Sequence, residues 1–140
     1  MLYKGSCHCG AVTFSVELPS TVEVEQCNCS VCSKSGFLHL IVPKSQFHLL
    51  TGEESLTTYT FNTGVAKHYF CKHCGIKPFY IPRSNPDGVD VNLNALDSRP
   101  PNISIVQFDG QNWEENAASL ADKSKEWLHR GEVSHICDPP

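Results

Sequence analysis

Three cysteines lie close together in the segment CNCSVC, at Cys27, Cys29 and Cys32, with no histidine among them. Thiolates at this spacing can bind one zinc ion from a single loop, and Zn²⁺ in proteins usually takes four ligands in a tetrahedron. Three protein ligands and one open position are typical of a catalytic zinc, which can bind water, polarise a carbonyl or accept an incoming thiolate. The segment therefore predicts a reactive metal site.

The sequence leaves alternatives open for this site. A structural site would need a fourth ligand, which Cys137 in the segment SHICDPP or a nearby histidine could supply. The three cysteines could also share one site with another cysteine pair and leave spare thiols. Spacing alone does not decide between these arrangements.

Two further cysteine pairs have a common design, in which two thiols on a tight turn are followed by glycine. These pairs are Cys7-His8-Cys9-Gly10 and Cys71-Lys72-His73-Cys74-Gly75. Glycine tolerates the positive φ that turns backbone N–H groups toward the sulfurs. Two such pairs predict a closed four-sulfur zinc site, with His8 or His73 as an alternative ligand. Structural zinc supplies about 10–16 kcal/mol of apparent binding free energy, which is large for a small core.

The 140 residues contain eight cysteines, which in a secreted chain would indicate disulfides. The first ten residues, MLYKGSCHCG, lack the apolar region of a signal peptide, and no apolar run approaches the ~20 residues that span a bilayer. We therefore expect a cytoplasmic protein, where a reducing environment favours metal ligation over disulfides. The formal net charge of −4 argues against nucleic acid or membrane partners. The oligomeric state is not predicted.

Alternation of apolar and polar residues predicts a mainly β fold with antiparallel strands. In AVTFSVEL, for example, Val12, Phe14 and Val16 alternate with polar residues. Short segments of this kind recur between Gly- and Pro-containing turns, namely TVEVEQ, FLHLIV, FHLL, SLTTYTF, AKHYF, KPFYIP, VDVNL and NISIVQF. Such a series indicates one domain over residues 1–112. Residues 113–140 form a C-terminal extension of different character, where EENAASLADKSKEWLHRG could be partly helical.

The combined cysteine pattern resembles that of the glutathione-dependent formaldehyde-activating family, which includes the centromere protein V relatives. The resemblance covers roughly residues 3–110 and rests on C-x-C-G, then C-x-C-x-x-C, then F-C-x-x-C-G. It implies a β-tent fold, similar to methionine sulfoxide reductase B and the Rab-interacting zinc factors. It also implies two zinc ions per chain. The structural zinc would take Cys7, Cys9, Cys71 and Cys74, and the catalytic zinc would take Cys27, Cys29 and Cys32.

The family reaction joins glutathione and formaldehyde into S-(hydroxymethyl)glutathione, and is classed as a carbon–sulfur lyase running in reverse. The expected function is thus a zinc-dependent lyase acting on the adduct of a small aldehyde with glutathione or a similar thiol. A zinc with an open position would bind and deprotonate the thiol, so no protein nucleophile is required. The segment IKPFYIPRSNPDG, which follows Gly75, looks more like the centromere protein V branch, so the substrate is left open.

Other residues have both a functional and a structural interpretation. Arg83, in the loop PRSNPDG, could hold a glutathione carboxylate by a bidentate contact or could simply be solvated. His39 and His68, on expected strands, could act as acid–base groups near the second zinc or be satisfied structural histidines. Asn92 and Asn94 form a polar strand face that could line a pocket or meet water.

Two alternative functions remain from the sequence. The protein could be a non-enzymatic, zinc-stabilised binding module, which a filled or absent second zinc would favour. It could also be a methionine sulfoxide reductase, which would need a redox-active cysteine that does not bind zinc. Only Cys137 is left over for that role.

Overall fold

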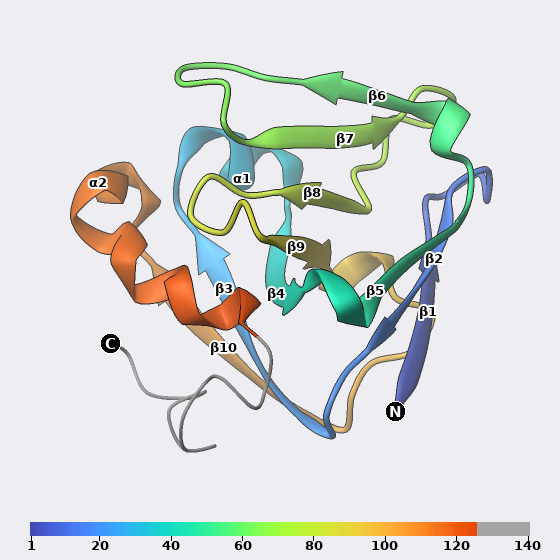
Figure 1. Ribbon diagram of the computed structural model, residues 1–140, viewed down its shortest axis with the longest axis horizontal. Coiled ribbons are helices and arrows are strands. Elements are labelled where there is room, and N and C mark those ends of the chain that lie inside the picture. The colour runs from blue at the N-terminus through green and yellow to red at the C-terminus, as the bar shows by residue number, and fades with distance from the viewer. Residues whose placement is uncertain (126–140) are drawn as a thin grey trace.

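The computed structural model describes residues 1–125 and consists of two β-sheets with short helices at their edges (Figure 1). The smaller sheet has the order β1-β2-β5. Its strands are β1 (Leu2–Ser6), β2 (Thr13–Glu17) and β5 (Phe47–Thr51). The larger sheet has seven strands in the order β10-β3-β4-β9-β8-β7-β6. They are β3 (Thr21–Cys27), β4 (Leu38–Pro43), β6 (Leu56–Tyr59), β7 (Lys67–Cys71), β8 (Phe79–Ile81), β9 (Gly88–Asn92) and β10 (Asn102–Phe108).

All strand pairs are antiparallel except β3 and β10, which run parallel. The mainly β class expected from the sequence is confirmed, and every expected strand segment contains a strand. Strand β1 and helix α1 (Ser30–Ser35) were not expected. Short 3-10 turns connect several strands: η1 (Lys44–Gln46), η2 (Glu53–Ser55), η3 (Leu93–Ala95) and η4 (Gly110–Asn112).

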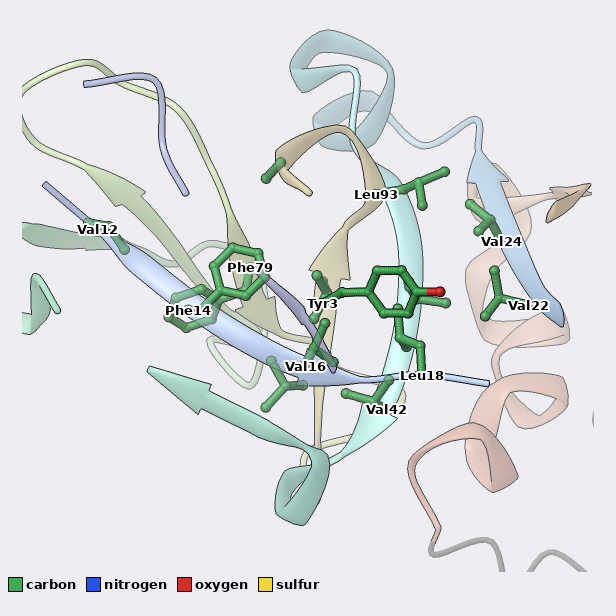
Figure 2. Close-up of a cluster of buried hydrophobic side chains, with 14 of the residues drawn as sticks. Tyr3, Val12, Phe14, Val16, Leu18, Val22, Val24, Val42, Phe79 and Leu93 are labelled. Atoms are coloured by element: carbon green, nitrogen blue, oxygen red, sulfur yellow. The ribbon is translucent and has the colours of Figure 1, made fainter. Parts of the chain in front are cut away.

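The hydrophobic core lies between the two sheets (Figure 2). The small sheet contributes Phe14 and Val16, which are fully buried, and the large sheet contributes Val24 and Val91, which are equally buried. Phe14 packs against Phe79 across the interface, with ring centroids 6.3 Å apart. Because successive side chains along a strand point to opposite faces of the sheet, every second residue lies in this core and the residues between them lie on the opposite face.

The opposite face of the large sheet carries a row of polar residues. Residues that are direct partners in an antiparallel pair point to the same face. Glu25 pairs with His39 across β3 and β4, and Asp90, Tyr80 and His68 are successive partners across β9, β8 and β7. All five side chains are buried although none belongs to the hydrophobic core. This polar row is the base on which the candidate site is built.

The chain after β10 covers part of this polar face. It forms helix α2 (Trp113–Asn116) and the 3-10 helix η5 (Ala117–Ser124), and η5 packs against β4. Asn85 Nδ2 donates to the Leu120 carbonyl at 2.8 Å, and Lys123 Nζ lies 2.6 Å from Glu25 Oε1. Residues 113–124 are thus helical, and Trp127 and Leu128, which the sequence also placed in the possible helix, lie outside the described residues. Within residues 1–125, no helix is both long and apolar enough to cross a membrane.

Candidate metal centres and cavity

The first cysteine cluster brings together two pairs from distant parts of the sequence, the C-x-C pair near the N-terminus and the C-x-x-C pair after β7. Its ligand atoms all lie within 4.8 Å of one another, and the residues are Cys7, Cys9, Cys71 and Cys74. Cys9 Sγ lies 3.7 Å from both Cys7 Sγ and Cys71 Sγ. These residues come from the β1–β2 turn and the turn after β7, so the cluster ties the small sheet to the large one.

The sulfur spacing fits a zinc ion. Four thiolates at ~2.3 Å from zinc in a tetrahedron have sulfurs about 3.8 Å apart. The observed 3.7 Å agrees with that spacing and is far longer than the ~2.05 Å of a disulfide. Every cysteine among residues 1–125 is a free thiol. The four residues are therefore a group that could hold a metal ion.

Backbone groups of the two turns point at the sulfurs. Val12 N–H donates to Cys7 Sγ at 3.3 Å, and His73 N–H donates to Cys71 Sγ at 3.4 Å. Gly10 and Gly75 have φ of 82° and 77°, the left-handed region that these turns require. His8 and His73 are not members of the cluster, so the four cysteines form it without them.

The second cluster forms where β3 leads into α1. Cys27 ends β3, Cys29 is the N-cap of α1, and Cys32 lies in its first turn. The mutually close set of ligand atoms here comprises Cys27, Cys32 and His39, with Cys29 outside it. His39 Nε2 lies 3.1 Å from Cys32 Sγ. The structure thus places His39 beside the cysteines, which the spacing of CNCSVC did not indicate.

His39 is held by a buried carboxylate. Asp90 Oδ2 lies 2.6 Å from His39 Nδ1, and Asp90 Oδ1 accepts a hydrogen bond from Leu40 N–H at 3.1 Å. Burial lowers the pKa of His39, but the charge and hydrogen bond of Asp90 outweigh it, so this pKa is raised. In the neutral ring, an Nδ1–H donated to the carboxylate leaves the Nε2 lone pair directed at the cysteines. Carboxylate–histidine pairs of this kind orient metal-binding imidazoles in proteins.

The three cysteines share their protons unequally. Hydrogen bonds from Cys27 and Cys32 lower the pKa of Cys29 to about 2. The pKa of Cys32 is raised, chiefly by its hydrogen bonds with Cys27 and Cys29. Gly110, in η4, packs closely against these cysteines. A Cβ on Gly110 would collide with Cys27 Sγ and would lie 3.0 Å from Cys29 Cβ.

A cavity of about 620 Å³ opens onto the second cluster. Its floor is the polar row, and its walls come from α1, the hairpin tip between β6 and β7, and the α2–η5 segment. Aromatic and aliphatic wall residues include Phe61, Phe108, Trp113 and Leu120. This volume exceeds what a one-carbon aldehyde needs and is in the range of pockets that bind larger organic molecules.

Arg83 lies at the rim of the cavity. Its guanidinium carbon is 4.0 Å from the centre of the Trp113 ring, and its Nη2 lies 2.7 Å from Glu114 Oε1. Glu114 is exposed, with 75% of its side chain accessible. An exposed ion pair of this kind contributes at most about 1 kcal/mol. Because this ion pair is weak, Arg83 can release Glu114 and pair with another anionic group at the cavity.

Two buried polar atoms on the cavity floor have no hydrogen-bond partner among residues 1–125. One is Glu25 Oε2, whose carboxylate lies beside Lys123 through Oε1. Burial raises the pKa of Glu25 to about 7 although Lys123 opposes this. The other is His68 Nε2. Such atoms are uncommon in folded proteins and call for an explanation.

The remaining residues singled out in the sequence have other places. Asn92 Nδ2 donates to the Lys77 carbonyl and its Oδ1 accepts from Asn94 N–H, so Asn92 organises the turn after β9. Neither Asn92 nor Asn94 lines the cavity. Cys137, the alternative fourth ligand, lies outside the described residues. Asp90 gave no sequence signal beyond its place in VDVNL, because its partner His39 is 51 positions away.

A two-sheet fold with a four-cysteine cluster, and a second cysteine cluster facing a cavity, defines a protein that could bind metal at two sites. Residues 2–111 match the model of the family described as "Glutathione-dependent formaldehyde-activating enzyme". The chain belongs to this family.

A curated relative carries the name of this family, and a protein of known structure is similar to the chain. The chain is 28% identical over 135 residues to a Halomonas elongata protein named "Putative glutathione-dependent formaldehyde-activating enzyme", covering 88% of this chain and 86% of the relative. It is similar to a Rhodobacter sphaeroides protein of known crystal structure, with a TM-score of 0.65 and 37% identity. That similarity covers 74% of this chain and 99% of the other.

Proposed function

We propose that this protein is a zinc-dependent carbon–sulfur lyase that interconverts a small aldehyde plus glutathione, or a similar thiol, with their S-hydroxyalkyl adduct. Family membership supports an enzyme acting on formaldehyde with glutathione. We also infer that the two sheets form a β-tent and that the extension from residue 113 is an addition to the family domain. The cytoplasm, as a reducing compartment, suits the free thiols.

One observation carries the proposal: the second cysteine cluster lines a cavity, whereas the four cysteines of the first cluster, of which Cys9 is exposed, do not. Cys71 is fully buried, and the first cluster ties two sheets together. Cys27 and Cys29 instead line a cavity of about 620 Å³. A closed four-ligand group is suited to a structural ion, and an accessible three-ligand group is suited to catalysis.

We assign Cys7, Cys9, Cys71 and Cys74 to a structural zinc and Cys27, Cys29 and Cys32 to a second zinc. When bound there, the second zinc would supply a Lewis acid that lowers the pKa of an entering thiol. The His39 Nε2 lone pair, fixed by Asp90, can serve as a ligand or accept the thiol proton. In the reaction the thiol sulfur bonds to the carbonyl carbon, and the carbonyl oxygen gains a proton from water.

We infer that Arg83 binds a carboxylate of glutathione at the cavity rim. Its ion pair with the exposed Glu114 is readily exchanged, and Trp113 keeps the guanidinium plane in place. Replacing Arg83 by Gln should then raise the KM for glutathione. The KM for 2-mercaptoethanol, which has no carboxylate, should stay the same.

The test of the function is exchange NMR between formaldehyde, glutathione and their adduct, in the presence of zinc-loaded protein. Because the uncatalysed reaction is appreciable, the control is the Cys29→Ser variant at equal concentration. The proposal expects exchange accelerated by the intact protein and not by the variant. No acceleration with two zinc ions confirmed by mass would reject this function and leave the binding-module alternative.

A further inference from the structure

His68 is a buried histidine. Its stacking neighbours explain the position of its ring but not the presence of its two ring nitrogens. Its ring lies parallel to Tyr80, with centroids 4.7 Å apart and an angle of 10°, and also stacks on Phe61 at 5.3 Å. Only 5% of His68 is exposed, and it lines the cavity that contains Cys29. A phenylalanine would satisfy the same stacking, so the ring nitrogens need a separate account.

Lys77 determines which nitrogen of His68 carries the proton. Lys77 Nζ lies 2.6 Å from His68 Nδ1. Burial lowers the pKa of Lys77, while the charges of Cys32 and Asp90 and its position 3.9 Å from the Tyr80 ring centre favour the charged form. The ammonium group has donors and no acceptor. Nδ1 must therefore accept from Lys77, which leaves the hydrogen of the neutral ring on Nε2. His68 Nε2 has no partner among residues 1–125, so this buried N–H is an unused donor.

We propose, on the basis of the function proposed above, that His68 Nε2–H is a catalytic donor to the carbonyl oxygen of the aldehyde. The glutathione thiolate attacks the carbonyl carbon, a carbon–sulfur bond forms, and the π electron pair moves to oxygen. His68 Nε2–H stabilises the negative charge that develops on this oxygen. Water then supplies the proton that completes the hydroxyl group, balancing the proton that the thiol lost on entry.

The surroundings suit a donor that remains neutral. Burial and the charge of Lys77 lower the pKa of His68 to about 4, so near pH 7 the ring polarises the carbonyl without titrating. The charges of Cys29 and Asp90 act in the opposite direction on this pKa, and both His68 and Cys29 line the cavity. The Lys77 charge behind the ring adds to the positive potential on the aldehyde side.

The test compares His68→Phe, which keeps a stacking ring without the donor, with His68→Gln, which keeps an N–H group. Tyr59→Leu is the matched control, because Tyr59 contacts the same stack without lining the cavity, and its replacement leaves the donor in place. Removal of one such donor typically lowers kcat by 10²–10³-fold. We expect that loss in His68→Phe, with zinc content and the KM for glutathione unchanged, a smaller loss in His68→Gln, and little change in Tyr59→Leu.

The outcomes separate this inference from the proposed function. If the parent accelerates exchange and His68→Phe does so equally well, the inference is wrong and the function stands. If the zinc-loaded parent does not accelerate exchange, both are overturned. Should His68→Phe fail to fold, ¹⁵N NMR of the parent decides: a proton on Nε2 supports the inference, and a proton on Nδ1 overturns it.

Discussion

Asp90 and His39 form a buried pair, with Asp90 Oδ2 2.6 Å from His39 Nδ1, directly behind the cysteine cluster. Asp90 is 1% exposed and is fixed by Leu40 N–H through its other oxygen. The pair turns His39 Nε2 toward Cys32, 3.1 Å away. The folded protein thus adds the oriented imidazole of His39 to the cysteines of the sequence motif.

Replacing Asp90 by Asn should loosen this imidazole. An amide can still accept from Leu40 N–H, but it no longer supplies the charge that holds Nδ1–H. Changes of this kind typically cost 10–100-fold in metal affinity or activity. Competition with a chromophoric chelator should show weaker binding of the second zinc and unchanged binding of the first. Equal affinities in parent and variant would show that Asp90 does not position His39.

The two cysteine clusters should respond differently to substitution. Cys71→Ser removes a fully buried member of the cluster that joins the sheets, and structural zinc supplies about 10–16 kcal/mol. We expect this variant, like metal-stripped protein, to unfold at much lower temperature or to be insoluble. Cys29→Ser should keep the fold and lose the activity. Similar melting temperatures for the two variants would refute this division of roles.

Gly110→Ala should disturb the second cluster selectively. Its new methyl group would collide with Cys27 Sγ, and the backbone of η4 or the loop of Cys29 must move. We expect zinc content near one per chain instead of two, with little loss of stability. The control is Gly64→Ala, where no atom lies within 4 Å and only the strain of a positive φ is added. Two zinc ions in Gly110→Ala would show that the cluster tolerates this shift.

The buried His68 should make the protein less stable in acid. Its pKa in the folded protein is about 4, whereas an unfolded histidine titrates near 6.5, so below about pH 6.5 the unfolded state binds more protons. Stability is therefore lost as the pH falls from about 6.5 toward 4. Linkage gives a loss of about 2 kcal/mol between pH 7 and pH 5 for this group.

Denaturant unfolding of the zinc-loaded parent and of His68→Phe at both pH values measures this loss. Protonation of the cysteines weakens both proteins alike, so the difference between the two pH-dependent losses isolates His68. The parent should lose about 2 kcal/mol more than His68→Phe. Equal losses would show that the folded protein does not depress the pKa of His68.

Local patterns in the sequence predicted most strands, because alternation of apolar and polar residues is retained wherever one face meets the core. Strand β1 was missed because its inward positions include Gly5, which carries no side chain to mark the pattern. A Cβ on Gly5 would lie 2.6 Å from the Ala95 carbonyl oxygen, so the close approach of the sheets excludes larger residues. Helix α1 was missed because its six residues are too few for a helical period.

The candidate site was only partly predictable for a different reason. The cysteine pairs could be recognised in the sequence, because the two cysteines of each pair are closely spaced within a single turn. The contribution of His39 and Asp90 depends on the register of β4 and β9, which pairs His39 with Asn92 and Ile41 with Asp90. The pairing of strands distant in sequence is not encoded in any local pattern, so the polar row could not be assembled from the sequence.

The central claim is that the second cluster keeps a position free for an incoming thiol. The most direct measurement is the optical spectrum of the cobalt-substituted protein, with two Co²⁺ ions per chain, as glutathione is added. We predict that thiolate-to-cobalt charge-transfer absorption increases and saturates at one glutathione per chain, in the parent and not in Cys29→Ser. An unchanged spectrum in the parent, with both ions still bound, would contradict the claim.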